Sequence, residues 1–216
     1  MATIKINASE TELVSKALME FALYAHVDSS FDVSSFPPLR RLQIEHHRWQ
    51  SEKLSLNADR SLAVMNLGIV EEACWELPVA VEEDSRDEIF DTLGDILIYT
   101  MACCTDLRLD FMTLARDFDA GELQMVQGLE GWMNLYKGIG MLAHVVGKNR
   151  QRTRGYDDLE KCRMHGGAAI ARICSAVHWL CFSNDWEPSV LLQEVASKVM
   201  QRDWTKNSTS GEVAQA

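Results

Sequence analysis

Four carboxylates between residues 72 and 95 are the side chains of this sequence whose spacing is best suited to chemistry. Glu72 and Glu76 are four residues apart, and so are Asp91 and Asp95. On an α-helix, a spacing of four places both members of a pair on one face. Oxygen ligands of this kind suit Mg²⁺ or Mn²⁺ and not zinc. The spacing therefore predicts a divalent-cation site wherever the two pairs face each other.

The apolar residues around each pair indicate which way the carboxylates point. The first pair continues a helical row that holds Met65 and Ile69, and the second continues a row that holds Ile98 and Ala102. Rows of apolar residues at this spacing face the protein core, so we expect the carboxylates to point inward. An acidic protein also carries many solvated acidic helix faces, and that simpler interpretation stays open.

The polar turn over residues 82–87 aligns the two pairs. If the flanking helices form an antiparallel hairpin, Glu76 lies level with Asp91, and Glu72 lies level with Asp95. At a rise of about 1.5 Å per residue the two levels are roughly 6 Å apart, which suits one or two cations. Four inward carboxylates with no Lys or Arg among them repel one another and resist ionisation, so a cation would relieve them.

The elements that must position these groups are helices throughout. Apolar residues recur at spacings of three and four, no convincing alternating run is present, and the chain has only four prolines. We expect an all-α protein. Pro78 is expected to kink or end the first helix of the hairpin just past Glu76. The expected helices span residues 8–25, 38–55, 60–82, 87–106, 110–118, 121–150, 157–183 and 187–202.

A weak internal repeat suggests that the chain is a tandem of two related halves. Leu67-Gly68-Ile69-Val70 aligns with Ile139-Gly140-Met141-Leu142, and each half then continues with the same order of long and short helices. The predicted divisions are an N-terminal helix and linker over 1–36, a metal-binding half over 37–118, a degenerate half over 119–204 and a flexible tail over 205–216.

Composition limits the classes of partner. The 216 residues are 47% hydrophobic and 25% charged, as in a soluble globular protein. The sequence has no run apolar enough to span a membrane and no signal segment, so we expect a cytoplasmic protein. A net charge of −11 opposes binding to nucleic acid, although a small phosphorylated ligand remains possible through a bridging cation. Six cysteines without zinc-site spacing are expected to be buried free thiols.

The acidic hairpin resembles the all-α nucleotide pyrophosphohydrolase superfamily, which includes the MazG-like proteins and the dimeric dUTPases. That family pattern is a helix reading EExxE followed by a helix reading ExxD before an apolar run. Gly68-Ile69-Val70-Glu71-Glu72 and Leu93-Gly94-Asp95-Ile96-Leu97-Ile98-Tyr99 are similar to it. The likeness covers roughly residues 40–118 well and the second half only in outline. It implies a MazG-like helical bundle.

The resemblance implies Mg²⁺, with Mn²⁺ as a substitute, held by Glu72, Glu76, Asp91 and Asp95. It also implies that Glu72 and Glu76 serve catalysis. Two positions depart from the pattern, because the middle acid of the first motif falls on Ala73 and the Glu of the second falls on Thr92, one residue from Asp91. The site then holds either a substitute acid or fewer ions than the family does.

The resemblance implies a substrate site around the acids. Lys198 and Arg202 resemble family residues that contact phosphate, while His46 and Trp49 lie where family members line the base pocket. Packing at the end of an amphipathic helix explains His46 and Trp49 equally well. Trp75, beside the acids, is expected to be core.

In the second half the acids are replaced. Glu72 aligns with His144 and Glu76 with Lys148, while the region of the two Asp residues falls near Ala168 and Arg172. We do not expect that half to bind metal. A basic cluster formed by Lys148, Arg150, Arg152 and Arg154 is either a solvated turn or a phosphate contact.

The function implied by the resemblance is hydrolysis of a nucleoside triphosphate to the monophosphate and pyrophosphate, by a homodimer. The alternative is a non-catalytic MazG-like protein that binds a nucleotide or a partner helix, and a third possibility is a helical scaffold. No membrane or nucleic-acid partner is expected.

Overall fold

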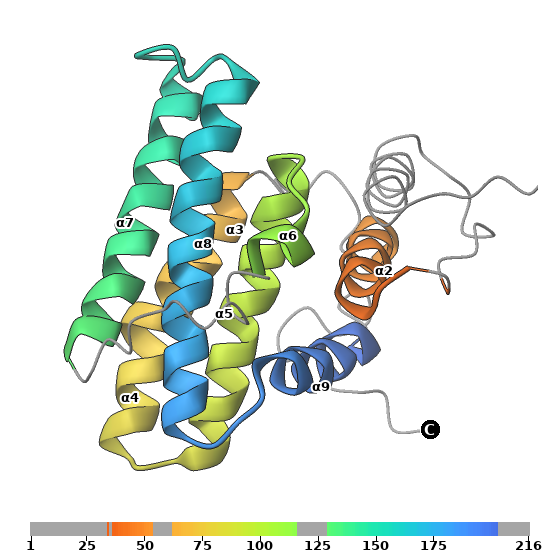
Figure 1. Cartoon of the computed structure of the whole chain (residues 1–216), viewed down its shortest axis with the longest axis vertical. Coiled ribbons are helices and arrows are strands. Elements are labelled where there is room, and N and C mark those ends of the chain that lie inside the picture. Colours follow the sequence, from red (N-terminus) through yellow and green to blue (C-terminus); the bar gives the residue numbers. More distant parts are fainter. Residues whose placement is uncertain (1–33, 35, 54–61, 116–128, 203–216) are drawn as a thin grey trace, which may run out of the picture.

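A computed structural model describes residues 34, 36–53, 62–115 and 129–202, and the elements in these ranges are all helical (Figure 1). The expected helix over 8–25 and the tail over 205–216 lie outside the described residues. The helices are α2 (Pro38–Lys53), α3 (Leu62–Glu71), η1 (Glu72–Glu76), α4 (Leu77–Glu82), α5 (Arg86–Asp106), α6 (Phe111–Ala115), α7 (Leu129–Gln151), α8 (Leu159–Ser183) and α9 (Pro188–Gln201). The prediction of an all-α packed bundle is confirmed for this part of the chain.

The helix predicted over 60–82 is not one uniform α-helix. Its middle, Glu72–Glu76, is a π-helix, in which the backbone N–H of Leu77 donates to the carbonyl of Glu72, five residues earlier. Pro78 gives the physical reason, since it has no N–H to donate to the carbonyl of Cys74, and its ring would clash with that carbonyl in a regular α-helix. The helix therefore widens by one residue and continues, instead of ending at Pro78.

Helix α5 is the centre of the bundle. Twelve of its 21 residues are buried, among them Leu93, Ile96 and Leu97, and it packs against α3, α4, α8, α9 and α2. Full burial of one such aliphatic side chain contributes about 1.5–3 kcal/mol, so this row accounts for much of the stability of the bundle. A β-carbon added at Gly94 would lie 2.4 Å from Val195, so this glycine lets α9 approach α5 closely.

Helices α7 and α8 form a long hairpin that lies along α3 and α5 (Figure 1). Gly138 permits their close contact, because an added β-carbon would lie 3.0 Å from the backbone nitrogen of Ile173. The connecting turn passes through Gly155 in the left-handed region, at φ +75°. Asp158 then caps α8 by accepting a hydrogen bond from the backbone N–H of Glu160.

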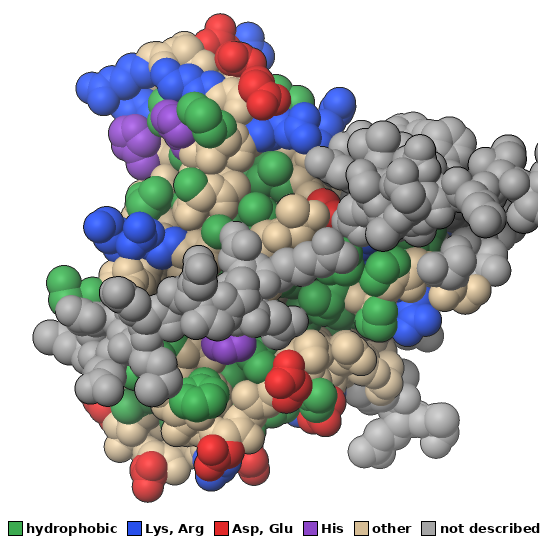
Figure 2. Space-filling view, viewed as in Figure 1, with side chains coloured by type: hydrophobic (Ala, Val, Ile, Leu, Met, Phe, Trp, Pro, Cys, Tyr) green, Lys and Arg blue, Asp and Glu red, His purple; other side chains and the backbone are tan. Residues whose placement is uncertain are grey.

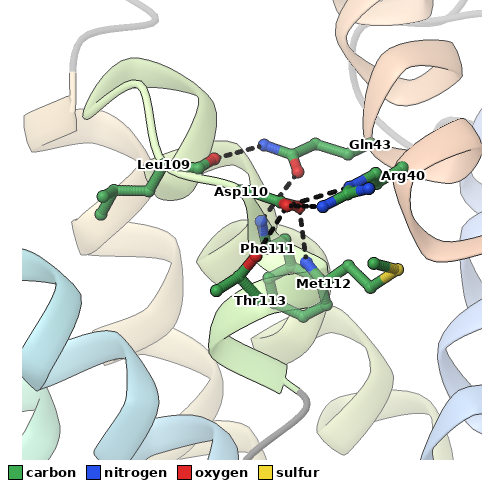
Figure 3. Close-up of polar contacts among 7 residues, drawn as sticks. All are labelled: Arg40, Gln43, Leu109, Asp110, Phe111, Met112 and Thr113. Atoms are coloured by element: carbon green, nitrogen blue, oxygen red, sulfur yellow. Dashed lines mark hydrogen bonds and ion pairs between the residues drawn. The ribbon is translucent and has the colours of Figure 1, made fainter. Parts of the chain in front are cut away.

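A buried ion pair holds α2 against the start of α6 (Figure 3). Arg40 Nε and Nη2 donate to Asp110 Oδ2 at 2.9 and 2.6 Å. Asp110 also caps α6 by accepting from the backbone N–H of Met112, while Gln43 accepts from the backbone N–H of Phe111. Two functions, helix capping and the docking of α2, therefore depend on the same carboxylate.

The six cysteines are free thiols, and five of them are buried. Cys74 is the exception to the predicted burial, because it lies on the outer side of the π-helix and is exposed. Within the described ranges, every helix is too short or too polar to cross a bilayer.

Candidate functional site

The four predicted carboxylates come from η1 and α5, which pack against each other. Glu72 is buried, with 8% of its surface exposed, whereas Glu76 is exposed and Asp91 and Asp95 are half-buried. The prediction that all four point inward is therefore correct in full only for Glu72. The exposure of the four carboxyl groups therefore increases from Glu72, through the two Asp residues, to Glu76.

Burial and mutual repulsion both act on these carboxyl groups. The pKa of Glu72 is raised to about 8, first by desolvation and then by the charges of Asp95, Glu76 and Glu71. The pKa of Asp95 is raised to about 6 by desolvation, and Asp91 and Glu76 add to the rise. Glu72, Glu76, Asp91 and Asp95 thus lie near enough to affect one another, as the mirrored spacing predicts.

Two cationic side chains at the end of α9 lie beside the acids. Lys198 Nζ donates to Asp91 Oδ1 at 2.7 Å, across 107 residues of sequence. The charge of Arg202 lowers the pKa of both Glu72 and Asp95 against the upward effect of burial. The sequence-based prediction that these two residues belong beside the acidic hairpin agrees with this placement.

The donor chemistry of the site fits a hard divalent cation, although the side chains are not gathered around one point. Glu72 Oε2 is buried and has no hydrogen-bond partner among the described residues, which is a costly state for a carboxylate oxygen. Within the described ranges, however, no three His, Cys, Asp or Glu side chains converge closely enough to hold a metal ion. Binding would require Asp91 to leave Lys198 and the exposed Glu76 to rotate inward.

The two departures from the family pattern fall on buried positions. Ala73 is fully buried in the core and Thr92 is 4% exposed. A Glu at either position would therefore project into the bundle interior. These two uncharged residues fit the packing of the helices. Any cation at this site would therefore be bound by the neighbouring acids alone.

The residues predicted to line a base pocket lie on α2. His46 is buried, its pKa is lowered to about 4 by desolvation and by the charge of His47, and its ring stacks on Trp49 at 5.7 Å between centroids. The imidazole is therefore neutral at pH 7. Trp49 is half-buried, and its indole nitrogen has no hydrogen-bond partner within the described ranges.

Trp75 is exposed, and the four basic residues predicted to form a cluster lie at the end of α7 and in the turn after it. The expectation that Trp75 is core is wrong, because 69% of its surface is exposed; the wider π-turn carries it to the outside. Lys148 and Arg150 lie in the last turn of α7, and Arg152 and Arg154 lie in the turn that follows.

Sequence reasoning missed Tyr99 as a member of this site. The charges of Glu72 and Asp95 help desolvation to raise its pKa to about 12, and its ring fills the space above Gly68. Spacing alone contains the signal, because Tyr99 is four residues after Asp95 and Gly68 is four residues before Glu72. The phenol stays protonated at neutral pH and is a potential donor beside the acids.

The described part of the chain is thus an all-α helical bundle with a partly buried acidic site bordered by two cationic residues. Comparison with protein-family models, with curated proteins and with solved structures gives no match to this chain. The resemblance to the nucleotide pyrophosphohydrolases therefore stays a prediction based on the acidic motifs.

Proposed function

We propose that this protein is a Mg²⁺-dependent nucleoside triphosphate pyrophosphohydrolase. The observation that supports this proposal best is the grouping of Glu72, Glu76 and Asp95 on the α3–η1–α4 and α5 hairpin with Lys198 and Arg202 of α9 beside them. Cleavage of a phosphoanhydride requires carboxylates that bind a cation and, next to them, cationic side chains that bind phosphate. The π-helix adds support, since such turns occur often at functional sites.

The carboxylates would bind the cation and accept a proton from the attacking water. Glu72, Asp91 and Asp95, with Glu76, would hold Mg²⁺, which would supply positive charge to the phosphates and lower the pKa of a water molecule. Water attacks the α-phosphorus, the bond from that phosphorus to the bridging α–β oxygen breaks, and pyrophosphate leaves. Glu76, the most exposed of the acids, takes the proton from the water.

The cations of α9 act on the leaving group. Lys198 and Arg202 offset the negative charge that develops on pyrophosphate. In the structure, Lys198 pairs with Asp91. Nucleotide binding would exchange this carboxylate for a phosphate and release Asp91 for the cation, which couples substrate binding to completion of the metal site.

A second candidate function is a binding protein without turnover. It is favoured by the uncharged Ala73 and Thr92 and by the incomplete convergence of the acids. Such a protein would still bind a nucleotide with Mg²⁺ but would release no pyrophosphate.

The test is pyrophosphate release from a panel of ribo- and deoxyribonucleoside triphosphates with Mg²⁺ or Mn²⁺. Asp95→Asn should abolish turnover. Asp185→Asn is the matched control, because Asp185 is exposed on the α8–α9 turn at φ +58°, a conformation that Asn also adopts readily. Equal loss in both variants, or turnover that survives Asp95→Asn, would contradict the proposed site. Metal-dependent nucleotide binding without turnover would establish the second candidate.

A further inference from the structure

An open pocket, called the cavity below, lies between α7 and α8, on elements separate from the acidic hairpin. It has a volume of about 550 Å³ and is lined by Lys137, Gly140, Met141, His144, Tyr156 and His165 among others. Cavities that hold small organic ligands have volumes of about 300–1,000 Å³ and are mostly apolar with a few polar groups. The lining here has that composition, with Val145 and Ala168 completing its apolar part.

The polar groups of this cavity are all basic or neutral. Lys137, His144 and His165 line it, and no Asp or Glu among the described residues does. Figure 2 shows Lys, Arg and His side chains at this end of the molecule, with Asp and Glu side chains beside them, in a protein whose net charge is −11. A ligand with a negative charge would be attracted to the lining itself, where Lys137, His144 and His165 are the basic side chains that the structure describes.

Tyr156 holds the two imidazole rings in place. Its hydroxyl and Nδ1 of His165 are 2.5 Å apart and share a hydrogen bond, and its ring packs edge-on against His144 at 5.9 Å between centroids. Lys161 covers the ring of Tyr156 at 4.8 Å from the centroid. The ring of Tyr156 is 6% exposed. The cavity wall is thus built from side chains that already fix one another, which lowers the entropic cost of binding.

Gly140 is an exposed part of the lining and leaves room for a ligand. It lies on α7 three residues after Lys137 and four before His144, so all three share one face of the helix. A β-carbon at this position would have no atom within 4 Å, so a larger side chain can be placed there without a clash inside the bundle.

We propose that this cavity binds a small organic anion with an apolar body. The anionic group lies by Lys137 and the two imidazoles, and the apolar body packs on Met141, Val145 and Ala168. In the alignment of the two halves, His144 occupies the position of Glu72, so the second half would have replaced a cation site by an anion site at the equivalent place. This inference does not depend on the proposed activity of the acidic hairpin.

The first experiment is a fluorescence titration of the full chain with 1-anilinonaphthalene-8-sulfonate, an anion with an aromatic body. Gly140→Leu should raise its Kd by about tenfold or more, a loss of ~1.4 kcal/mol, because the new side chain fills the cavity. Gly147→Leu is the matched control, since a β-carbon there also meets nothing within 4 Å while Gly147 does not line the cavity. It should leave the Kd unchanged. Equal affinity in the two variants would overturn the proposal.

The second experiment tests the charge. Lys137→Gln should weaken binding of the sulfonate by roughly three- to fivefold, the effect of one solvent-screened charge pair, and should not affect N-phenyl-1-naphthylamine, the uncharged parent. Laurate and naphthoate, as competitors for the sulfonate, then distinguish an aliphatic from an aromatic body. Equal weakening of the charged and uncharged probes, or displacement by neither competitor, would overturn the assignment to an organic anion. Thermal melting of each variant establishes that it is folded.

Discussion

Replacing Glu72 by Gln should stabilise the metal-free protein while removing its response to Mg²⁺. Glu72 is buried, one of its oxygens has no hydrogen-bond partner among the described residues, and its pKa is raised from 4.5 to about 8. The folded state therefore holds a proton that the unfolded state releases between about pH 4.5 and 8. Stability linked to Glu72 is fully present below pH 4.5 and is lost as pH rises through 8.

The stability that Glu72→Gln should gain can be calculated from the pKa shift of Glu72. At 1.36 kcal/mol per pKa unit, the shift accumulated by pH 7 corresponds to at most about 3.4 kcal/mol, and solvent screening at this partly open site reduces it to about 2 kcal/mol. Glu72→Gln escapes this penalty because Gln carries no titrating proton. For a chain of 216 residues, about 2 kcal/mol corresponds to a rise in Tm of roughly 4–8 °C near pH 7, and to almost none near pH 5.

Saturating Mg²⁺ should raise the Tm of wild type above that of Glu72→Gln. At a concentration of 100 times its Kd, a ligand that binds only the folded state adds about 2.7 kcal/mol, which wild type gains and the variant forgoes. The assay is thermal melting near pH 5 and pH 7, with a chelator or with saturating Mg²⁺. Glu82→Gln is the control, since Glu82 is exposed at the end of α4 and is not among the charges that shift the pKa of Glu72. If wild type melts above Glu72→Gln in chelator near pH 7, the reasoning about burial and repulsion is refuted.

Three further variants test other parts of the structure. Asp110→Ala should cost about 3–5 kcal/mol in urea unfolding because it removes one partner of a buried ion pair and the cap of α6, and a cost below 1 kcal/mol would mean that the pair is dispensable. Gly94→Ala should destabilise by about 1–3 kcal/mol, since its β-carbon would overlap Val195; unchanged stability in thermal melting would contradict the close packing of α5 and α9. Lys198→Gln removes only an exposed ion pair and should change stability by less than about 1 kcal/mol, but it should raise KM for a nucleoside triphosphate; an unchanged KM would remove Lys198 from the substrate site.

Helix positions could be predicted from sequence because the apolar spacing is a local signal. The described ends of the predicted helices agree with the structure to within two residues, as for α8, expected over 157–183 and found at Leu159–Ser183. The grouping of the acids could also be predicted, since one polar turn fixes the level at which two antiparallel helices meet.

The features that could not be predicted depend on backbone detail and long-range contacts. Pro78 signalled a disturbance in the helix, but its position alone does not decide between an ended helix, a kink and a π-turn. That choice decides the exposure of Cys74 and Trp75. The cavity between α7 and α8 depends on the contact of Tyr156 with His144 and His165, and helical periodicity carries no information about a turn residue folding back over two helices.

The ion pair between Arg40 and Asp110 also sets a schedule for folding during synthesis. The two residues are 70 positions apart in the chain. At translation rates of roughly 5–20 residues per second, Asp110 is made about 4–14 s after Arg40. Throughout that interval Asp110 is not yet present to accept from Arg40, and Leu42 and Ile44 of α2 have no completed bundle to pack on. A nascent chain of this protein therefore passes through a period in which its earliest described helix cannot yet dock on the bundle, and slowing translation between these two positions would lengthen that period.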